Sequence, residues 1–331
     1  ARHAGLQGGV PQEVPMLTLS RICGSGIQSI VSGAQMIMLD EAKTVVSGGM
    51  ENLSQAPHVM RGGREGWKLG RSPKVEDYMM TNLQDMTCGL FMAQTADELC
   101  KRKSVTREEI DAFAALSHSR VAASIDNDVF EQEIVPVTIT SRRGDTVLTH
   151  KDEDHVVRGT TEESLSRLPT AFGPESFVTA GNASGVVDGA AAVVIKSASK
   201  AKEDGDQPLA RIVSWGIVGL EPAIMSYGPV PSSRKALEKA GLTVGDIDRW
   251  EINEAFAGQA VACIKDLEID VEKVNVNGGA VGIGHPLAAT GTRLVLTLAY
   301  ELQRSGGRYG VATACIGGGQ GIAMVIEAIK Q

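Results

Sequence analysis

The chain has 331 residues, of which 43% are hydrophobic, 4% aromatic and 22% charged, and its formal net charge at pH 7 is -8. The negative charge argues against a nucleic-acid-binding surface, because phosphate recognition needs a concentrated basic face. Apolar runs such as 190–195 are far shorter than the roughly 18 residues of a membrane-spanning helix. We therefore expect a globular protein of about two domains that binds neither nucleic acid nor membrane.

The five cysteines include no C-x-x-C pair, which is typical of a reducing compartment. Because these cysteines and the six histidines lack short paired spacings, no zinc site is predicted. We interpret Cys88, Cys100 and Cys263 as small hydrophobic residues of helices. The compartment predicted is the cytoplasm. A mitochondrial or peroxisomal location stays open, because no start methionine precedes Ala1 and a targeting segment could lie upstream.

The spacing of apolar residues predicts the elements in chain order. The first are a helix at 1–6, a strand at 16–19, a helix at 26–38 and a strand at 44–47, the last three forming a right-handed parallel unit. Helices follow at 92–100 and 107–125, the second opened by a capping box of Thr106 and Glu109. The later strands are predicted at 190–195, 247–252, 273–276 and 309–314. Three later helices are predicted: one is headed by Ser232 and Ser233 and runs through Ala240 to stop at Gly241, one begins within 253–257, and one spans 289–303.

The strand, helix and strand of the N-terminal region recur as a pattern near the C-terminus, which we interpret as an internal duplication. The strand at 190–195 is expected to return the chain to the first half. We predict three parts, which are an N-terminal α/β half of residues 1–56 and 187–207, a loop domain of residues 57–186 that contributes to substrate binding, and a C-terminal half of residues 208–331.

Three chemically reactive residues are flanked by glycine. Cys23 lies between a predicted strand and a predicted helix, where the helix N-terminus would lower its pKa below the value of about 8.5 for a free cysteine. His285 lies in a loop between Gly284 and Pro286, where an imidazole can be directed at a neighbour. Cys315 precedes residues 317–319, a triple glycine whose backbone donors suit an oxyanion hole. The alternatives are a buried turn cysteine, a structural histidine and a simple tight turn.

A dinucleotide site is not predicted, because residues 24–26 (Gly-Ser-Gly) lack the third glycine of G-x-G-x-x-G. The sequence instead resembles the thiolase family over all 331 residues. The resemblance rests on five blocks in order, at residues 21–26, 179–185, 253–257, 275–286 and 315–319. It implies a duplicated five-layer α-β-α-β-α fold with an inserted loop domain, assembled as a homodimer or homotetramer. It further implies acyl-CoA and CoA as substrates and no tightly bound cofactor.

The resemblance also implies the roles of single residues. Cys23 would attack the acyl-CoA thioester after His285 accepts its proton, and Cys315 would remove a proton from the α-carbon of acetyl-CoA. His285 and a water held by Asn253 would form one oxyanion hole, and the backbone N–H groups of Cys23 and Gly317 would form the other. On its own pattern, Asn253 is equally well interpreted as a helix N-cap.

The family pattern places a further set of residues along the CoA groove, which are Ser164, Leu168, Phe172, Ser184, Met225, Ala255 and Phe256. Met92 matches a residue of the acyl pocket, and Phe91 stands where acetoacetyl-CoA-forming members commonly have histidine, which favours the degradative 3-ketoacyl-CoA type. Arg158 lies one position away from a basic residue that would meet the CoA phosphates, and a solvated surface arginine is an equal alternative.

Two other functions are compatible with this broad fold. A decarboxylating ketoacyl synthase would need a cysteine and two histidines, so Cys315 in the third position argues against it. A thiolase-like lipid-binding protein without catalysis is disfavoured because Cys23, Asn253 and His285 are intact. Family members also extend further upstream through a strand, a helix and a strand. Without this strand, helix and strand, the chain is expected to expose a central sheet edge and to aggregate when expressed alone. A monodisperse and active recombinant protein that begins at Ala1 would contradict this expectation.

Overall fold

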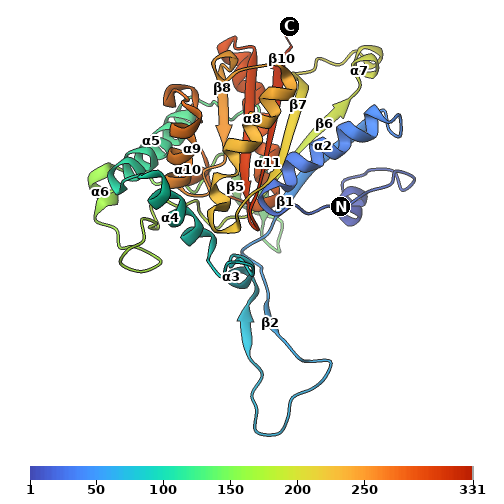
Figure 1. Cartoon of the computed structure of the whole chain (residues 1–331). Coiled ribbons are helices and arrows are strands. Elements are labelled where there is room, and N and C mark those ends of the chain that lie inside the picture. Colours follow the sequence, from blue (N-terminus) through green and yellow to red (C-terminus); the bar gives the residue numbers. More distant parts are fainter. Residues whose placement is uncertain (330–331) are drawn as a thin grey trace.

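The computed structural model describes residues 1–329, so the last two positions of the predicted C-terminal half lie outside it. Figure 1 shows a layered α/β body from which a long hairpin projects. The helices are α1 (Arg2–Gln7), α2 (Ser25–Met38), α3 (Tyr78–Asn82), α4 (Met92–Lys103), α5 (Arg107–Asp126), α6 (Glu162–Ser166), α7 (Ala198–Asp204), α8 (Pro229–Ala240), α9 (Ala257–Leu267), α10 (Ala280–Ile283) and α11 (Leu287–Ser305). Four 3₁₀ segments lie at η1 (Ile22–Gly24), η2 (Pro222–Tyr227), η3 (Val244–Asp246) and η4 (Val271–Lys273).

The strands form one central sheet, one smaller sheet and two hairpins. They are β1 (Thr44–Glu51), β2 (His58–Met60), β3 (Val75–Asp77), β4 (Val137–Thr140), β5 (Thr146–His150), β6 (Gly189–Lys196), β7 (Ala210–Gly219), β8 (Arg249–Ile252), β9 (Tyr309–Ile316) and β10 (Gln320–Ala328). The central sheet has the order β7-β10-β9-β8, with β8 and β9 parallel and the other pairs antiparallel. The smaller sheet pairs β1 with β6 antiparallel, which returns the chain to the first half as expected.

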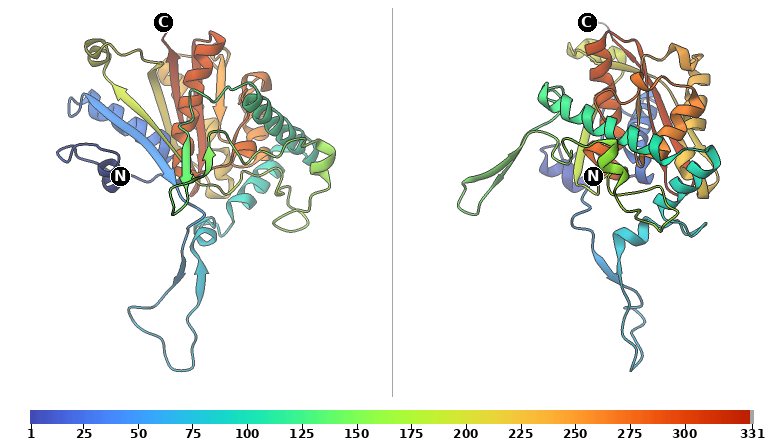
Figure 2. Two further views of the ribbon diagram at one scale, coloured as in Figure 1. Left: turned by 180° about the vertical axis from the view of Figure 1, so that it is seen from behind. Right: turned by 90° about the vertical axis from the view of Figure 1, so that its left-hand side faces the viewer.

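Helix and sheet layers alternate through the body. Helix α8 packs on one face of the central sheet, against β7, β9 and β10. On the other face, α11 contacts β8 and β9 and also reaches β1 and β6 of the smaller sheet, with α2 beside it. Figures 1 and 2 show α2 and α11 between the two sheets. These layers follow the first four of the expected α-β-α-β-α order, and the central helices lie where both halves meet.

The two central helices touch through their backbones. A Cβ atom added at Gly26 would lie 2.3 Å from the backbone nitrogen of Thr292, and one added at Gly291 would lie 2.5 Å from that of Ile27. Real side chains cannot approach so closely, so glycine is required on both helices. The contact also brings η1, which contains Cys23, against the N-terminal part of α11.

Two predicted strands are absent. Among residues 1–329, no strand lies beside 16–19 and β1 pairs only with β6, and Leu17 is largely exposed. The parallel unit predicted for 16–47 is therefore wrong. Residues 273–276 make a single parallel bridge, from Val274 to Trp250. There Asn275 has a φ of 43°. Its side-chain amide, in place of a strand backbone, accepts the N–H of Ile252 at 2.8 Å and donates to the carbonyl of Ile252 at 2.9 Å. The prediction of a strand is therefore also wrong.

Other predicted elements are confirmed with shifted ends. Helices 26–38, 92–100, 107–125 and 289–303 are present as α2, α4, α5 and α11. Strand β1 runs on to Glu51, whose carboxylate accepts the N–H of Ala288 at the start of α11. Helix α8 begins at Pro229, before the predicted Ser232, because proline is favoured in the first helical turn. Its C-terminal Gly241 is left-handed as expected, with a φ of 68°.

The segment between the halves combines helices that pack on the body with hairpins that project from it. Helices α4 and α5 pack against α9, and α5 also contacts α6 and α10. The predicted capping box is present, because the N–H of Glu109 donates to Thr106 Oγ1 at 3.3 Å and the N–H of Thr106 donates to Glu109 Oε2 at 2.9 Å. Hairpins β2–β3 and β4–β5 extend away from the layers (Figure 2). Within residues 1–329, no helix has both the length and the apolar character needed to cross a bilayer.

Two hydrophobic clusters fill the body on opposite faces of the central sheet. One surrounds Trp250 and Val311 and includes much of α9, and the other joins Ile27 of α2 to Leu294 and Leu298 of α11. A polar contact crosses between the sheet and α11, where the partly buried Arg293 donates from Nη1 to Oε2 of the buried Glu251 at 3.0 Å. Because Glu251 precedes Asn253 and Arg293 follows His285, this pair links two segments that lead to the site.

The buried carboxyl of Glu251 predicts a pH dependence of folding stability. Burial raises the pKa of Glu251 from 4.5 to about 8, with Arg293 opposing the rise. Between these values the folded state holds a proton that the unfolded state releases, so stability should fall by up to about 1.4 kcal/mol per pH unit as the pH rises. We expect Glu251→Gln to flatten this slope in urea unfolding at about pH 5 and about pH 8. The exposed control Glu131→Gln should leave the slope unchanged, and an unaltered slope in Glu251→Gln would contradict the assignment.

Candidate active site

Cys23 is buried in the 3₁₀ turn η1, directly before helix α2. Burial raises its pKa to about 11, while the backbone N–H groups of Gly317 and of Cys23 itself act in the opposite direction. The sequence-based expectation of a lowered pKa is therefore wrong for this structure, because desolvation outweighs the helix N-terminus. Cys23 is a neutral thiol at pH 7 and needs a base to become a nucleophile. The two backbone N–H groups partly offset the cost of ionising its sulfur.

His285 is buried in the loop between α10 and α11, and its hydrogen bonds fix its tautomer. The amide Nδ2 of Asn253, which can only donate, lies 3.2 Å from His285 Nε2, and this favours the tautomer with the proton on Nδ1. In that tautomer Nδ1 donates to Thr290 Oγ1 at 2.6 Å, and the Thr290 hydroxyl donates to the carbonyl of Pro286 at 3.1 Å. The other ring nitrogen, Nε2, is then an unprotonated acceptor that faces the amide of Asn253. Burial lowers the pKa of His285 to about 3, so the imidazole is neutral at pH 7. A neutral ring with an unprotonated Nε2 can act as a general base.

Asn253 lies at the end of β8 and faces His285. Its Nδ2 is 3.2 Å from His285 Nε2, and its backbone N–H donates to the carbonyl of Thr313 at 2.9 Å. The alternative interpretation as a helix N-cap is wrong, because α9 begins at Ala257 and is preceded by Phe256. Asn253 is fully buried, and its Oδ1 has no hydrogen-bond partner in the part of the chain that the structure describes.

Cys315 lies at the end of β9 and is completely buried. It packs with Met225 and Ala255, against which Met92 and Phe256 also pack. Burial and then the neighbouring thiol of Cys23 raise the pKa of Cys315 well above its ordinary value. A negative charge on Cys23 would therefore oppose ionisation of Cys315. The apolar surroundings would make the Cys315 thiolate a strong base.

The block at residues 179–185 joins the other segments of the site through backbone contacts. The N–H and the hydroxyl of Ser184 both donate to the carbonyl of Ala255, at 3.1 and 3.0 Å. The N–H of Ala257 donates to the carbonyl of Asn182 at 2.8 Å, and the N–H of His285 donates to that of Gly185 at 3.1 Å. Predicted CoA-contacting residues from separate blocks are thus brought together with His285.

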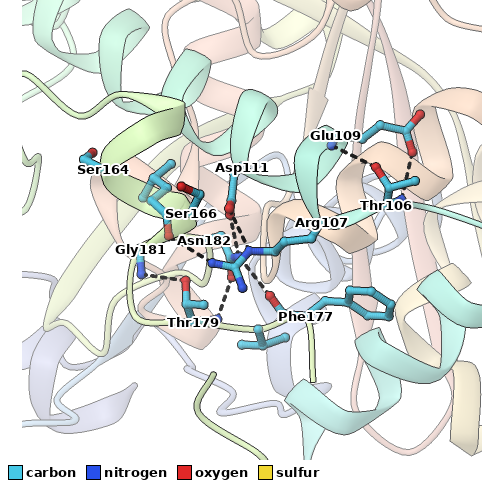
Figure 3. A network of polar contacts seen from close by, with 12 residues as sticks. Thr106, Arg107, Glu109, Asp111, Ser164, Ser166, Phe177, Thr179, Gly181 and Asn182 are labelled. Carbon is cyan, nitrogen blue, oxygen red and sulfur yellow. Dashed lines mark hydrogen bonds and ion pairs between the residues drawn. The ribbon is translucent and has the colours of Figure 1, made fainter. Parts of the chain in front are cut away.

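A polar network anchors this block to α5 (Figure 3). Asp111 is buried and accepts hydrogen bonds from Asn182 Nδ2 at 3.0 Å and from Arg107 Nε at 2.7 Å. Arg107 also donates to the carbonyl of Leu165 in α6 at 2.9 Å. The side-chain oxygen of Asn182 in turn accepts the N–H of Thr179 at 2.8 Å. The network fixes α6, α5 and the 179–185 block relative to one another.

The remaining predicted CoA residues lie further out. Ser164 is exposed and forms the first turn of α6 with Thr161, and Leu168 lies close over Gly181. Phe172 is partly buried, with its ring centroid 5.6 Å from that of Phe91. Arg158 is exposed and pairs with Asp126 at 3.0 Å. In this structure it is a surface arginine, which is the alternative interpretation of this residue.

Two polar residues of the site were not singled out by the sequence. Thr290 accepts the Nδ1 proton of His285 in the favoured tautomer. Its place in the first turn of α11, five residues after the histidine, is a signal that could have been used. Glu254, beside Asn253, is a fully buried carboxylate that binds the segment leading to His285. A buried charge must be paired, but its partners come from distant parts of the chain, so no local pattern identified it.

Comparisons with known proteins agree with this geometry. The thiolase N-terminal domain matches residues 1–199 and the thiolase C-terminal domain matches residues 206–328. The chain is 47% identical to the human mitochondrial 3-ketoacyl-CoA thiolase over 327 residues, which is 99% of this chain and 82% of that protein. It is 45% identical to the acetyl-CoA acetyltransferase of Shinella zoogloeoides over 331 residues, covering 99% of this chain and 83% of the relative.

Solved structures show the same likeness in three dimensions. The crystal structure of human mitochondrial 3-ketoacyl-CoA thiolase superposes with a TM-score of 0.96 at 46% identity, covering 99% of this chain and 83% of that one. The same human enzyme in complex with CoA gives a TM-score of 0.95. With both domains matched and the fold shared over nearly the whole chain, this protein belongs to the thiolase family.

Proposed function

We propose that this protein catalyses the reversible thiolysis of a 3-ketoacyl-CoA by CoA, which yields acetyl-CoA and a shortened acyl-CoA. The observation that carries the proposal is the neutral His285 with an unprotonated Nε2, held beside Asn253 in a buried site, together with the two buried thiols of Cys23 and Cys315. Such a set can transfer an acyl group through a thioester and can move a proton at carbon. The names of the relatives support this reaction class.

In the condensing direction, the first half-reaction makes an acyl-enzyme. His285 Nε2 takes the proton of Cys23, and the Cys23 sulfur attacks the thioester carbonyl of the acyl-CoA. The bond between the carbonyl and the CoA sulfur breaks, and the leaving CoA thiolate takes the proton of Cys315. The acyl group is then on Cys23, Cys315 is a thiolate and His285 is protonated.

The second half-reaction forms the carbon–carbon bond. The Cys315 thiolate removes a proton from the α-carbon of acetyl-CoA, and the resulting enolate attacks the acyl carbonyl on Cys23. The Cys23 sulfur leaves and regains its proton from His285, which restores all three residues. The raised pKa of Cys315 suits this step, because only a strong base can remove so weakly acidic a proton. Thiolysis is the same sequence in reverse.

Negative charge on oxygen develops in both half-reactions and needs donors at fixed positions. We assign one oxyanion hole to the N–H groups of Cys23 and Gly317, which already bear on the Cys23 sulfur. The other would use His285 Nε2 and a water that donates to Asn253 Oδ1. The lack of any other partner for that buried oxygen, within residues 1–329, supports this role.

The CoA substrate is proposed to lie along the 179–185 block and α6, with Ser184, Ser164, Leu168 and Phe172 on its pantetheine and nucleotide side and Met92, Met225, Ala255 and Phe256 near its thioester. The human relative solved with CoA supports this class of substrate. Arg158 would reach the phosphates only after leaving Asp126. Phe91 beside the pocket favours 3-ketoacyl chains longer than acetoacetyl, and the protein is proposed to work as a homodimer or homotetramer.

Iodoacetamide labelling followed by peptide mapping tests the reaction class. We expect Cys23 to be alkylated with loss of turnover and to be protected by acetyl-CoA, because acylation occupies the same sulfur. Rates of thiolysis for acetoacetyl-CoA and for a longer 3-ketoacyl-CoA, measured on the same preparation, then give the chain-length preference. Alkylation at another cysteine with full loss of turnover, or no protection by acetyl-CoA, would contradict the proposal.

A further inference from the structure

Glu254 is an ionisable side chain inside the active-site region to which the reaction gives no chemical task. It follows Asn253 directly and is fully buried. Its carboxylate accepts three hydrogen bonds, from Ser117 Oγ at 2.6 Å, from Asn275 Nδ2 at 2.7 Å and from the backbone N–H of Val281 at 3.0 Å. A buried carboxylate with this many donors is held in one position.

The partners of Glu254 belong to the segment that carries His285 or hold that segment in place. Asn275 and Val281 lie at either end of the turn that leads through α10 to His285. Ser117, on α5, also accepts the backbone N–H of Gly279 at 3.1 Å. A Cβ atom added at Gly279 would lie 2.3 Å from the carboxyl carbon of Glu254. The turn is therefore wrapped closely around the carboxylate.

The hydrogen bonds from Asn275 and Val281 require that the side chain at position 254 accept hydrogen bonds from both of them. Asn275 cannot rotate its amide, because Oδ1 already accepts the N–H of Ile252 and Nδ2 already donates to the carbonyl of Ile252. Its Nδ2 must therefore point a proton at Glu254 Oε1, and the N–H of Val281 must point one at Oε2. A glutamine in place of Glu254 would direct its own amide protons at one of these donors.

We propose that Glu254 is a positioning residue for catalysis, which holds His285 at hydrogen-bonding distance from Asn253. Both residues of the pair are tied to it, since Asn253 is its neighbour in the chain and the His285 segment is bound to its carboxylate. Through Ser117, helix α5 of the predicted loop domain takes part in the same connection. The inference rests on the proposed thiolysis reaction, in which His285 takes the proton of Cys23.

The variant Glu254→Gln tests this with two measurements. We expect kcat for thiolysis to fall about 100-fold, with the KM for CoA within about twofold, because a small displacement of His285 affects the reacting atoms and not the distant CoA contacts. We also expect the rate at which iodoacetamide alkylates Cys23 at neutral pH to fall about tenfold, with a changed pH profile, because a displaced His285 no longer takes the Cys23 proton. The matched control is Glu133→Gln, which removes another buried carboxylate, bonded to Thr297 Oγ1 at 2.6 Å.

Two outcomes would overturn the inference. One is a folded Glu254→Gln protein with kcat and alkylation rate within about threefold of the wild type. The other is an equal loss in Glu133→Gln. If Glu254→Gln does not fold, Ser117→Ala gives the second test, and unchanged kcat and alkylation in that folded variant would also overturn it. A wild-type protein without thiolysis would contradict the proposed function instead, and the alkylation rates would still decide the role of Glu254.

Discussion

Replacing Cys23 by serine is expected to lower kcat for thiolysis by about 10⁴-fold or more. A serine hydroxyl is far less acidic than the Cys23 thiol, whose pKa burial has already raised to about 11. The neutral His285 beside Asn253 cannot generate an alkoxide from it at a useful rate. The measurement is a steady-state thiolysis assay, with mass spectrometry of the protein after incubation with acetyl-CoA to detect the acyl adduct.

The matched control for this substitution is Cys100→Ser, at a buried cysteine of α4 that belongs to the hydrophobic cluster around Trp250. It should keep both the acyl adduct and the wild-type rate. An acyl adduct in Cys23→Ser at the wild-type level would show that another residue is the nucleophile. Loss of activity in both variants would point to a general effect of cysteine replacement.

Replacing Cys315 by alanine is expected to separate the two half-reactions. Acylation of Cys23 should continue, while condensation of two acetyl-CoA molecules should fall by about 10³-fold or more, because the base that acts on the α-carbon is missing. The measurement is a rapid-mixing assay with acetyl-CoA, in which release of CoA should show a burst equivalent to the enzyme concentration, followed by almost no turnover.

A second measurement on Cys315→Ala makes this test specific. Exchange of the α-protons of acetyl-CoA with deuterium from solvent should stop in the variant and continue in the wild type, because exchange needs the base and not the acyl acceptor. Normal condensation, or continued exchange, in Cys315→Ala would show that Cys315 is not the base. Absence of the burst would show that Cys315 is also needed for acylation.

The helices of the body could be predicted because their apolar spacing reports a buried stripe that the sequence itself contains. Helix α2 has Ile27, Ile30 and Val31 at helical spacing, and all three are buried. The capping box at the start of α5 was predictable for a similar reason, because both of its members lie within one turn. Local signals of this kind do not depend on what the rest of the chain does.

The two missing strands could not be predicted, because a strand depends on a neighbour. Residues 16–19 have the composition of a strand, but no strand lies beside them, and at 273–276 the side chain of Asn275 replaces the backbone ladder. A side-chain amide with this role has the same letter in the sequence as any surface asparagine. Whether these two segments form strands could therefore be decided only from the structure.

For the candidate active site, the sequence predicted which residues react but not their protonation state. Cys23, His285 and Cys315 were recognisable by their glycine neighbours, yet the direction of the pKa shift at Cys23 depends on how deeply the surrounding elements bury it. The roles of Thr290 and Glu254 depend on partners that only the fold brings near them. These two roles could not be predicted because the partners that define them are identified only by the fold.

The backbone contact between the central helices also limits how the two halves of this protein can diverge. Because no side chain separates Gly26 from Thr292, a mutation that adds one in either half must push the other half away. Cys23 and His285 precede these two helices, so the displacement would reach both. A hybrid that joins the first half of this chain to the second half of a distant relative should therefore work only where both parents kept glycine on their facing helices.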